Sequence, residues 1–286
     1  MRGTKGFFLL ILVVAVIFSL CSCTESSNSP TFSDGSEDFV NGSDFTTAMH
    51  GGTAKTLTGN CLIYNVFVND AESEWTAKAT ESVLGMLEEA ANFLERRFEE
   101  SGSDGKLSVR FTDASNSAFL SFDEAAPTDA SGMNWLGYAF SKTEHGTPNA
   151  YLKQCVKNVS DYDNVCFLFL FNKAGRSFAT PYDSQYKDCE DYRYERAQIF
   201  FSTDRSFEFF CNPSVLAHEL LHLFGAVDLY EPHVDTEDAA KVEELFPTEL
   251  MRFEPTDIFQ AEISSLTAYL IGWTKVLPNE YGFLFD

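Results

Sequence analysis

The sequence predicts an α+β fold, and three observations support this prediction. Short apolar runs such as residues 61–68 and 165–171 have the length and composition of β-strands. Apolar residues recur at helical spacing from about residue 73 to residue 100, which indicates one long amphipathic helix that stops near Gly102. The second half of the chain carries helix-start signals instead of strand patterns.

The strands of this fold are expected before about residue 202. The run at 165–171, VCFLFLF, is apolar throughout, which is typical of a strand buried on both faces of a sheet. Further strands are expected at 107–111 and 198–202. The stretches at 112–160 and 172–195 are polar and aromatic with scattered glycine and proline, so we expect long loops there.

The second half is expected to be mainly helical. The tripeptide Asn-Pro-Ser at 212–214 predicts a helix start, because asparagine is a good N-cap and proline fits the first turn. This helix should run to Gly225. The charged segment at 235–246, DTEDAAKVEELF, predicts a short surface helix, and a terminal helix should begin after Thr256.

The N-terminus has the composition of an export signal. Residues 1–22 combine two basic residues with an apolar core of about 14 residues, shorter than the roughly 20 that a membrane-spanning helix needs. The sequence LCSC at 20–23 resembles the bacterial lipobox, which implies that Cys23 is lipidated and becomes the first residue of the mature protein. A plain secretory signal with an incidental cysteine is the alternative. Residues 23–58 are rich in small polar residues and predict a flexible, lipid-anchored tether.

The chain is strongly acidic, with a formal net charge of −23 at pH 7. Such a surface argues against nucleic acid as a partner and against electrostatic binding to anionic membranes. We therefore expect contact with a membrane only through the N-terminal lipid. The protein is expected to be a monomer, exported to the bacterial cell surface or to the outer or periplasmic face. Residues 59–286 remain for one folded domain.

Cysteine usage does not predict a thiolate metal site, because the sequence has no CxxC pair. Cys61 and Cys166 lie within apolar runs and are expected to be buried free thiols. The sequence does not decide whether Cys189 and Cys211 form a disulfide bond. The cysteines after the N-terminal pair are Cys61, Cys155, Cys166, Cys189 and Cys211.

The stretch LAHELLHLFGAVDLY at 216–230 carries the residues best suited to catalysis. His218 and His222 are four positions apart, so a helix presents both rings on one face, where both can bind one metal ion. Glu219 is rotated by about 100° from His218, so its carboxylate would lie beside such an ion and could deprotonate a water molecule. A structural helix with unliganded histidines is the alternative.

Two histidines do not complete a catalytic zinc site, which usually has three protein ligands. Gly225 tolerates the left-handed conformation that ends a helix, so the chain can turn back there. Asp228 lies just past that turn and is the expected third ligand. The full pattern H-E-x-x-H-x-x-G-x-x-D is much rarer by chance than its first five positions alone. The remaining candidates for third ligand are His233, Glu231, Glu243 and Glu244.

The full pattern resembles the extended zinc motif of the metzincin metallopeptidases, in the snapalysin-type variant that has aspartate in place of the third histidine. The resemblance implies a zincin fold with a twisted, mostly parallel sheet, a long N-terminal helix and an active-site helix. It divides the domain into an upper part, to about residue 225, and a lower part, 226–286, with a terminal helix and a methionine turn beneath the zinc. Met251 is the candidate for this turn, because it is the only methionine after the motif.

One position departs from the family pattern. Some metzincins have a tyrosine two residues after the methionine, and this chain has Phe253, which lacks a hydroxyl group. Tyr230 is the candidate in its place for a hydroxyl near the metal.

The resemblance implies a zinc-dependent endopeptidase that hydrolyses extracellular proteins or peptides. In this reading His218, His222 and Asp228 bind Zn²⁺, and Glu219 is the general base toward a zinc-bound water. A catalytically inactive surface lipoprotein that uses the same fold for binding or adhesion is the alternative. Zinc scavenging would require a histidine-rich tract, and the five histidines of the chain form none.

Overall fold

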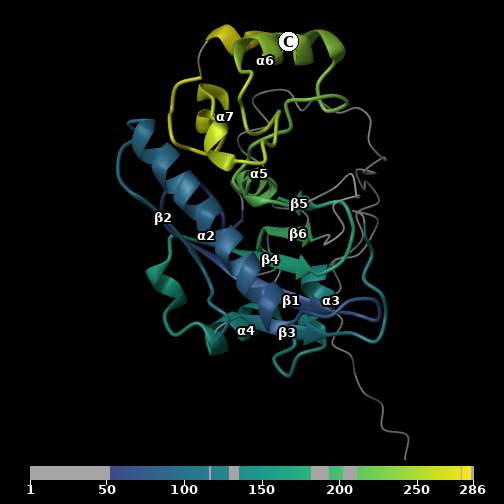
Figure 1. The fold of residues 1–286 in the computed structure, drawn as a ribbon. Helices are drawn as coiled ribbons and strands as arrows, with labels where there is room; N and C mark the ends of the chain where they lie inside the picture. The colour runs from purple at the N-terminus through teal and green to yellow at the C-terminus, as the bar shows by residue number, and fades with distance from the viewer. Residues whose placement is uncertain are drawn as a thin grey trace, which may run out of the picture. The chain divides into compact units, whose positions relative to one another are not determined.

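A six-stranded, mostly parallel sheet organises the structure, a computed structural model (Figure 1). The strands lie in the order β2–β1–β4–β6–β5, and β3 pairs with the second half of β1. Only the pair of β5 with β6 is antiparallel among these strands. The strands are β1 (Gly59–Asn69), β2 (Leu107–Phe111), β3 (Ala118–Ser121), β4 (Asn164–Phe171), β5 (Phe178–Thr180) and β6 (Arg196–Phe200).

The structure describes residues 52–115, 117–128, 135–181, 193–201, 211–277 and 279–284, all within the compact unit Gly35–Asp286. The predicted signal peptide at 1–22, the predicted lipidation site Cys23 and most of the predicted tether lie outside these ranges. Among the helices of the described segments, none combines the length and the apolar character that a membrane span requires.

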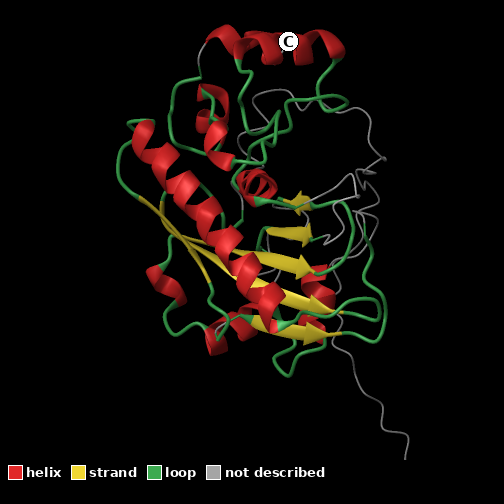
Figure 2. Cartoon of the chain, in the orientation of Figure 1, coloured by secondary structure: helices red, strands yellow, loops and turns green. Residues whose placement is uncertain are grey.

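Helices cover both faces of the sheet (Figure 2). The cluster of apolar side chains on one face includes α2 and α5, and the cluster on the other face includes α3 and α4. The α-helices are α2 (Ala77–Glu100), α3 (Trp135–Ser141), α4 (Pro148–Cys155), α5 (Pro213–Leu223), α6 (Thr236–Leu245) and α7 (Ser265–Leu270). The described residues also form the 3₁₀-helices η1 (Val159–Asp161), η4 (Ile258–Gln260) and η5 (Asn279–Leu284).

Strand β4 shows why the sheet needs cover on both sides. All eight of its residues are buried. Successive side chains of a strand point to opposite faces, so Leu168 and Leu170 pack with α2 and α5 while Phe167 and Phe169 pack in the other cluster. The prediction of a mixed fold with helices and a mostly parallel sheet is therefore confirmed.

Several predicted elements differ from the observed ones. The stretch expected to be a loop at 112–160 contains β3, α3, α4 and η1, and the one at 172–195 contains β5. These elements have three to eight residues, too few to show a clear hydrophobic period. The predicted terminal helix is only α7, which begins after its N-cap Ser264. The predicted strand at 198–202 begins earlier, at Arg196.

The folded part of the chain also begins before the predicted tether boundary at residue 58. The backbone N–H groups of Thr53 and Ala54 donate hydrogen bonds to the buried carboxylate of Glu195, at 2.9 and 2.8 Å. Gly52 passes so close that a Cβ there would collide with the carboxylate of Glu195. Further along, Leu57 N–H donates to the carbonyl of Ile271 at 2.9 Å. Residues 52–58 therefore join the sheet to the C-terminal part.

The described cysteines are free thiols: Cys61, Cys166 and Cys211 are buried and Cys155 is exposed. Burial raises the pKa of Cys61 to about 12, so this thiol stays protonated at neutral pH. The prediction that Cys61 and Cys166 are buried free thiols is confirmed. Cys189, considered from the sequence as a disulfide partner of Cys211, lies outside the described residues.

Candidate metal centre

Helix α5 begins with a strong N-terminal cap. The side-chain oxygen of Asn212 accepts hydrogen bonds from the N–H groups of Ser214 and Val215, at 2.8 and 3.2 Å. Pro213 occupies the first turn, where a missing N–H group costs least. Leu216, Leu220 and most other apolar residues of the helix are buried against the sheet and α2. Packing on several sides therefore fixes the rotation of α5, and with it the direction of its histidines.

The chain reverses at the end of α5. Gly225 has a φ of +103°, a backbone conformation that L side chains rarely adopt. The N–H of Ala226 then donates to the carbonyl of Leu221 at 3.1 Å, which closes the turn. The Ala226 carbonyl in turn lies 2.8 Å from Nδ1 of His222. The turn thus directs the chain back toward the helix and orients one histidine of the motif.

Three ligand atoms meet beside this turn. His218 Nε2 lies 3.0 Å from His222 Nε2. Asp228 Oδ1 lies 3.0 Å from His218 Nε2 and 3.2 Å from His222 Nε2. Within the described ranges, this is the one set of three or more metal-binding side chains that converges closely enough to hold an ion. The structure therefore brings together the three residues that the motif predicts as metal ligands.

The tautomers of the two histidines follow from their other ring nitrogens. Nδ1 of His218 faces the carbonyl of Leu250 at 3.2 Å, and Nδ1 of His222 faces the carbonyl of Ala226 at 2.8 Å. A carbonyl oxygen only accepts, so Nδ1 must carry the proton of each neutral ring. Both Nε2 lone pairs then point toward each other and toward Asp228 Oδ1, which is buried without a hydrogen bond. Three electron-pair donors at this distance repel one another unless a cation lies between them.

The donor set fits a small divalent cation. Ligands about 2.0–2.1 Å from a tetrahedral zinc ion lie about 3.3 Å apart, slightly more than the separations of 3.0 to 3.2 Å seen here. Two imidazole nitrogens and one carboxylate oxygen are typical zinc ligands that leave one position open. A possible His-His-Asp metal site is therefore present, and its residues fit the group that the motif implies.

The charges around the site favour a cation as well. Burial by itself lowers the pKa of His218, but the carboxylate of Asp228, with Glu219 and Glu254 nearby, raises that pKa to about 9. Burial would raise the pKa of Asp228, yet its two imidazole neighbours hold that pKa well below the usual range. The site therefore attracts positive charge, either a proton or a metal ion.

Glu219 lies in the same buried environment but is not one of the three converging ligands. The side chain is 6% exposed, and its Oε2 atom is buried without a hydrogen bond. Burial raises the pKa of Glu219 to about 7, although the neighbouring histidines act in the opposite direction. A carboxyl group with a pKa near neutrality can both accept and release a proton at physiological pH.

A segment of seven residues, 249–255, lies against these ligands, and we call it the Met251 segment. His218 Nδ1 donates to the carbonyl of Leu250, and the N–H of Leu229, next to Asp228, donates to the carbonyl of Met251 at 2.9 Å. The hydroxyl of Ser214, in the first turn of α5, donates to the carbonyl of Pro255. Met251 itself is fully buried. The predicted methionine turn is thus in direct contact with two elements that carry ligands.

The other predicted residues have different positions. His233 is 39% exposed, and its Nε2 lies 3.4 Å from Oδ2 of Asp228. The other two histidines face Oδ1 of the same carboxylate. The ring of Tyr230 lies 6.4 Å from that of His218, and Phe253 is 46% exposed. None of the three glutamates considered as rivals to Asp228 belongs to the converging set of described residues: Glu231, Glu243 and Glu244.

Two glutamates near the site are absent from the sequence prediction. Glu254 Oε1 lies 3.5 Å from Nδ1 of His218, and Glu249 lies at the start of the Met251 segment with its carboxylate buried. Both come from a part of the chain more than 25 residues after His222. The only feature of the sequence that could have indicated these two glutamates is their position within three residues of Met251.

No family model and no curated protein matches this chain. Among solved structures, it is similar to metalloproteinase-II from Bacteroides fragilis, with 11% sequence identity, 79% of this chain covered and a TM-score of 0.37. It is also similar to a structure of a chaperone–substrate complex, with 12% identity, 58% of this chain covered and a TM-score of 0.30. The chain spans 59% of the length of the metalloproteinase and 24% of the other chain. Likenesses at this level identify no family.

Proposed function

We propose that this chain is a zinc-dependent endopeptidase. The observation that carries the proposal is the convergence of His218 Nε2, His222 Nε2 and Asp228 Oδ1, with all three atoms within 3.2 Å of one another. The buried, unpaired carboxylate of Glu219 beside them supplies the base that hydrolysis needs. With neutral rings, His218, His222 and Asp228 are three electron-pair donors that face one another, an arrangement that a shared metal ion stabilises.

Two imidazoles and one carboxylate also suit ferrous iron, so the donor set alone does not choose the metal. Glu219 favours zinc and hydrolysis. Its carboxylate follows His218 directly, and its pKa is raised to about 7 by burial, which suits a group that takes up and returns a proton. Oxygen chemistry at iron has no evident use for such a base.

Different residues would bind the metal and transfer the proton in peptide hydrolysis. His218, His222 and Asp228 would hold the metal, and the hydrogen bonds that both imidazoles donate from Nδ1 to backbone carbonyls keep them in the tautomer that binds it. A bound zinc ion supplies Lewis acidity, which lowers the pKa of a water ligand and polarises the substrate carbonyl. Glu219 would take the proton of the attacking water and pass it to the leaving amine.

An extended substrate would fit along β5. This strand is the last one in the order of the sheet, it is antiparallel to its neighbour, and it lies beside α5. An edge strand presents unpaired N–H and C=O groups, to which an extended peptide can add as a further strand. This edge strand therefore lies next to the helix that carries His218 and His222.

We propose further that the enzyme acts outside the cytoplasm as a monomeric lipoprotein, carried on Cys23 and the tether that follows. The support for this is the apolar run and the lipobox-like LCSC of the N-terminus. The substrates would then be extracellular proteins or peptides. The alternative remains a surface lipoprotein that binds its partner without cleaving it.

Metal analysis together with a digestion assay separates these functions. The purified chain should contain close to one equivalent of zinc and should digest casein or a mixed peptide library. A chelator should stop the digestion, and zinc should restore it. Bound zinc with no digestion under any condition would favour the binding protein, and absence of bound zinc in protein made with zinc available would contradict the proposal.

A further inference from the structure

The Met251 segment is fixed from two sides. On one side, its carbonyls accept hydrogen bonds from His218 and Leu229, so it contacts the neighbours of the metal site. On the other side, Leu250 N–H donates to the carbonyl of Glu262 at 2.9 Å, which ties the segment to the strand-like stretch before α7. A shift of this segment would therefore move the acceptor that orients the ring of His218.

Glu249 is the side chain through which the segment is held on that second side. The side chain is 1% exposed. Its Oε1 accepts hydrogen bonds from the N–H of Met251 at 3.3 Å and from the hydroxyl of Thr267 at 2.9 Å. Its Oε2 accepts from the N–H of Ser264, the N-cap residue of α7. One buried carboxylate thus connects the turn at Met251 to the first turn of α7.

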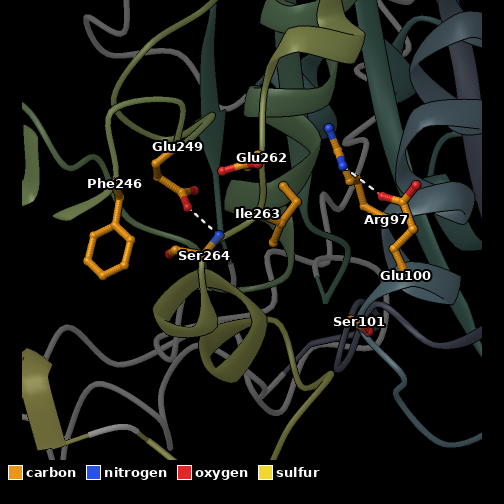
Figure 3. Close-up of a pocket in the computed structure, with 8 residues that line it drawn as sticks. All are labelled: Arg97, Glu100, Ser101, Phe246, Glu249, Glu262, Ile263 and Ser264. Carbon is orange, nitrogen blue, oxygen red and sulfur yellow. Dashed lines mark hydrogen bonds and ion pairs between the residues drawn. The ribbon is translucent and has the colours of Figure 1, made fainter.

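Glu249 lines a small pocket of about 210 Å³ between α2 and the C-terminal part. Figure 3 shows the side chains that line it. The carboxylate of Glu249 points to Ser264, and Glu262 also lines this pocket. Glu262 is exposed and accepts a hydrogen bond from the hydroxyl of Thr248 at 2.7 Å. The two glutamates therefore share a pocket, but of their two carboxylates only that of Glu249 accepts a hydrogen bond from Met251.

The position of Glu249 is costly for a carboxylate that only stabilises the fold. Burial raises its pKa, and hydrogen bonds from Ser264, Thr267 and Met251 only partly offset that effect. An apolar side chain of similar size would fill the same space without this cost. The three donors come from two separate elements, which indicates a role in holding those elements in register.

We propose that Glu249 is a positioning residue for the metal site. It fixes the turn at Met251 so that the carbonyl of Leu250 stays in place to accept the Nδ1 proton of His218. That hydrogen bond keeps Nε2 of His218 free and directed at the metal position, as outer-shell partners of histidine ligands do in general. This inference rests on the proposed function only in needing a metal bound by His218.

The test is the affinity of the full chain for zinc ion alone, measured by competition with a chromogenic chelator. Glu249→Ala should weaken zinc binding by about 10- to 100-fold, the usual cost of removing an outer-shell partner. Glu249→Gln keeps an oxygen that can accept from Met251 and Thr267, so its affinity should lie nearer to wild type. Glu262→Gln makes the same chemical change in the same pocket and should bind zinc as wild type does.

Two further measurements keep the outcome clear. The free energy of unfolding of each metal-free variant shows how much the fold itself is weakened. If Glu249→Ala does not fold, Thr267→Val tests the same connection, because it removes one donor to Glu249 and should weaken zinc binding in the same direction by less. A folded Glu249→Ala or Thr267→Val that is less stable but binds zinc as tightly as Glu262→Gln overturns the inference. Failure of wild type to bind zinc contradicts the proposed function instead.

Discussion

The Nε2 atom of His218 lies 3.0 Å from Oδ1 of Asp228, although the end of α5 and a reversal of the chain separate the two residues. The reversal at Gly225 makes this contact, and the carbonyls of Leu250 and Ala226 face the Nδ1 atoms, so that Nε2 of each ring faces the carboxylate. With neutral rings the contact joins a lone pair to a carboxylate oxygen, and a proton or a metal ion relieves the repulsion.

Asp228→Ala should remove stoichiometric zinc binding, because two imidazoles alone do not make a catalytic zinc site. The measurement is the metal content of the dialysed protein. Glu231→Ala is the matched control, since Glu231 is an exposed acidic residue three positions away that was a rival third ligand. Loss of zinc in the Glu231 variant, with retention in the Asp228 variant, would show that the ligand has been misidentified.

His233→Ala should retain zinc. His233 faces Oδ2 of Asp228 at 3.4 Å, too long for a good hydrogen bond, and it is outside the converging set. We therefore expect the zinc affinity to fall by less than about tenfold, the lower limit for an outer-shell partner. A chelator competition assay measures this, and a loss as large as that of His222→Ala would instead make His233 a ligand.

Gly225→Ala should destabilise the protein by about 1–3 kcal/mol, the usual cost of forcing a side chain into an unfavourable backbone conformation. The φ of +103° at this position is the reason. Gly85→Ala is the control, because Gly85 lies within α2 with open space around it. There alanine should stabilise by about 0.5–1 kcal/mol. Urea unfolding of both variants checks the pair, and equal signs would contradict the role given to Gly225.

The stability of the wild type should fall as the pH rises from about 4.5 to about 7, through Glu195. Burial raises the pKa of Glu195 from 4.5 to about 7 in the folded protein. Between these values the folded state binds more protons than the unfolded state, so stability is full at the lower pH and decreases upward. The decrease is at most about 3 kcal/mol.

Glu195→Gln isolates this effect, because glutamine does not titrate and the other buried carboxyl groups remain. The difference in unfolding free energy between wild type and variant should change across this pH range, as measured by urea unfolding at pH 4.5, 5.5 and 7. Parallel curves would show that Glu195 keeps its ordinary pKa in the folded protein.

The local parts of this protein were predictable from sequence, and the reason is physical. The motif residues from His218 to Asp228 lie within one helix end and one turn, so helix geometry and the freedom of glycine bring them together without knowledge of the rest. The mixture of strands with a long helix followed from periodicity in the same way. The identity of the metal and the activity stay predictions.

The tertiary parts were not predictable in this way. Glu249 and Glu254 approach the site only because the fold returns the chain beneath α5, and a single glutamate has no distinctive local pattern. Residues 52–58 were placed in the tether because their small polar composition resembles a linker, whereas their order depends on the carboxylate of Glu195, far away in the sequence. Composition alone could not reveal a partner of that kind.

Glu219→Gln tests the central claim most directly, because it changes one oxygen to nitrogen beside the metal position and leaves the three ligands intact. The variant should bind zinc as wild type does, with proteolysis reduced by at least about 10²-fold, the usual contribution of a general base. His222→Ala, measured in parallel, should lose both zinc and activity. Proteolysis at the wild-type rate in a zinc-loaded Glu219→Gln protein would contradict the account.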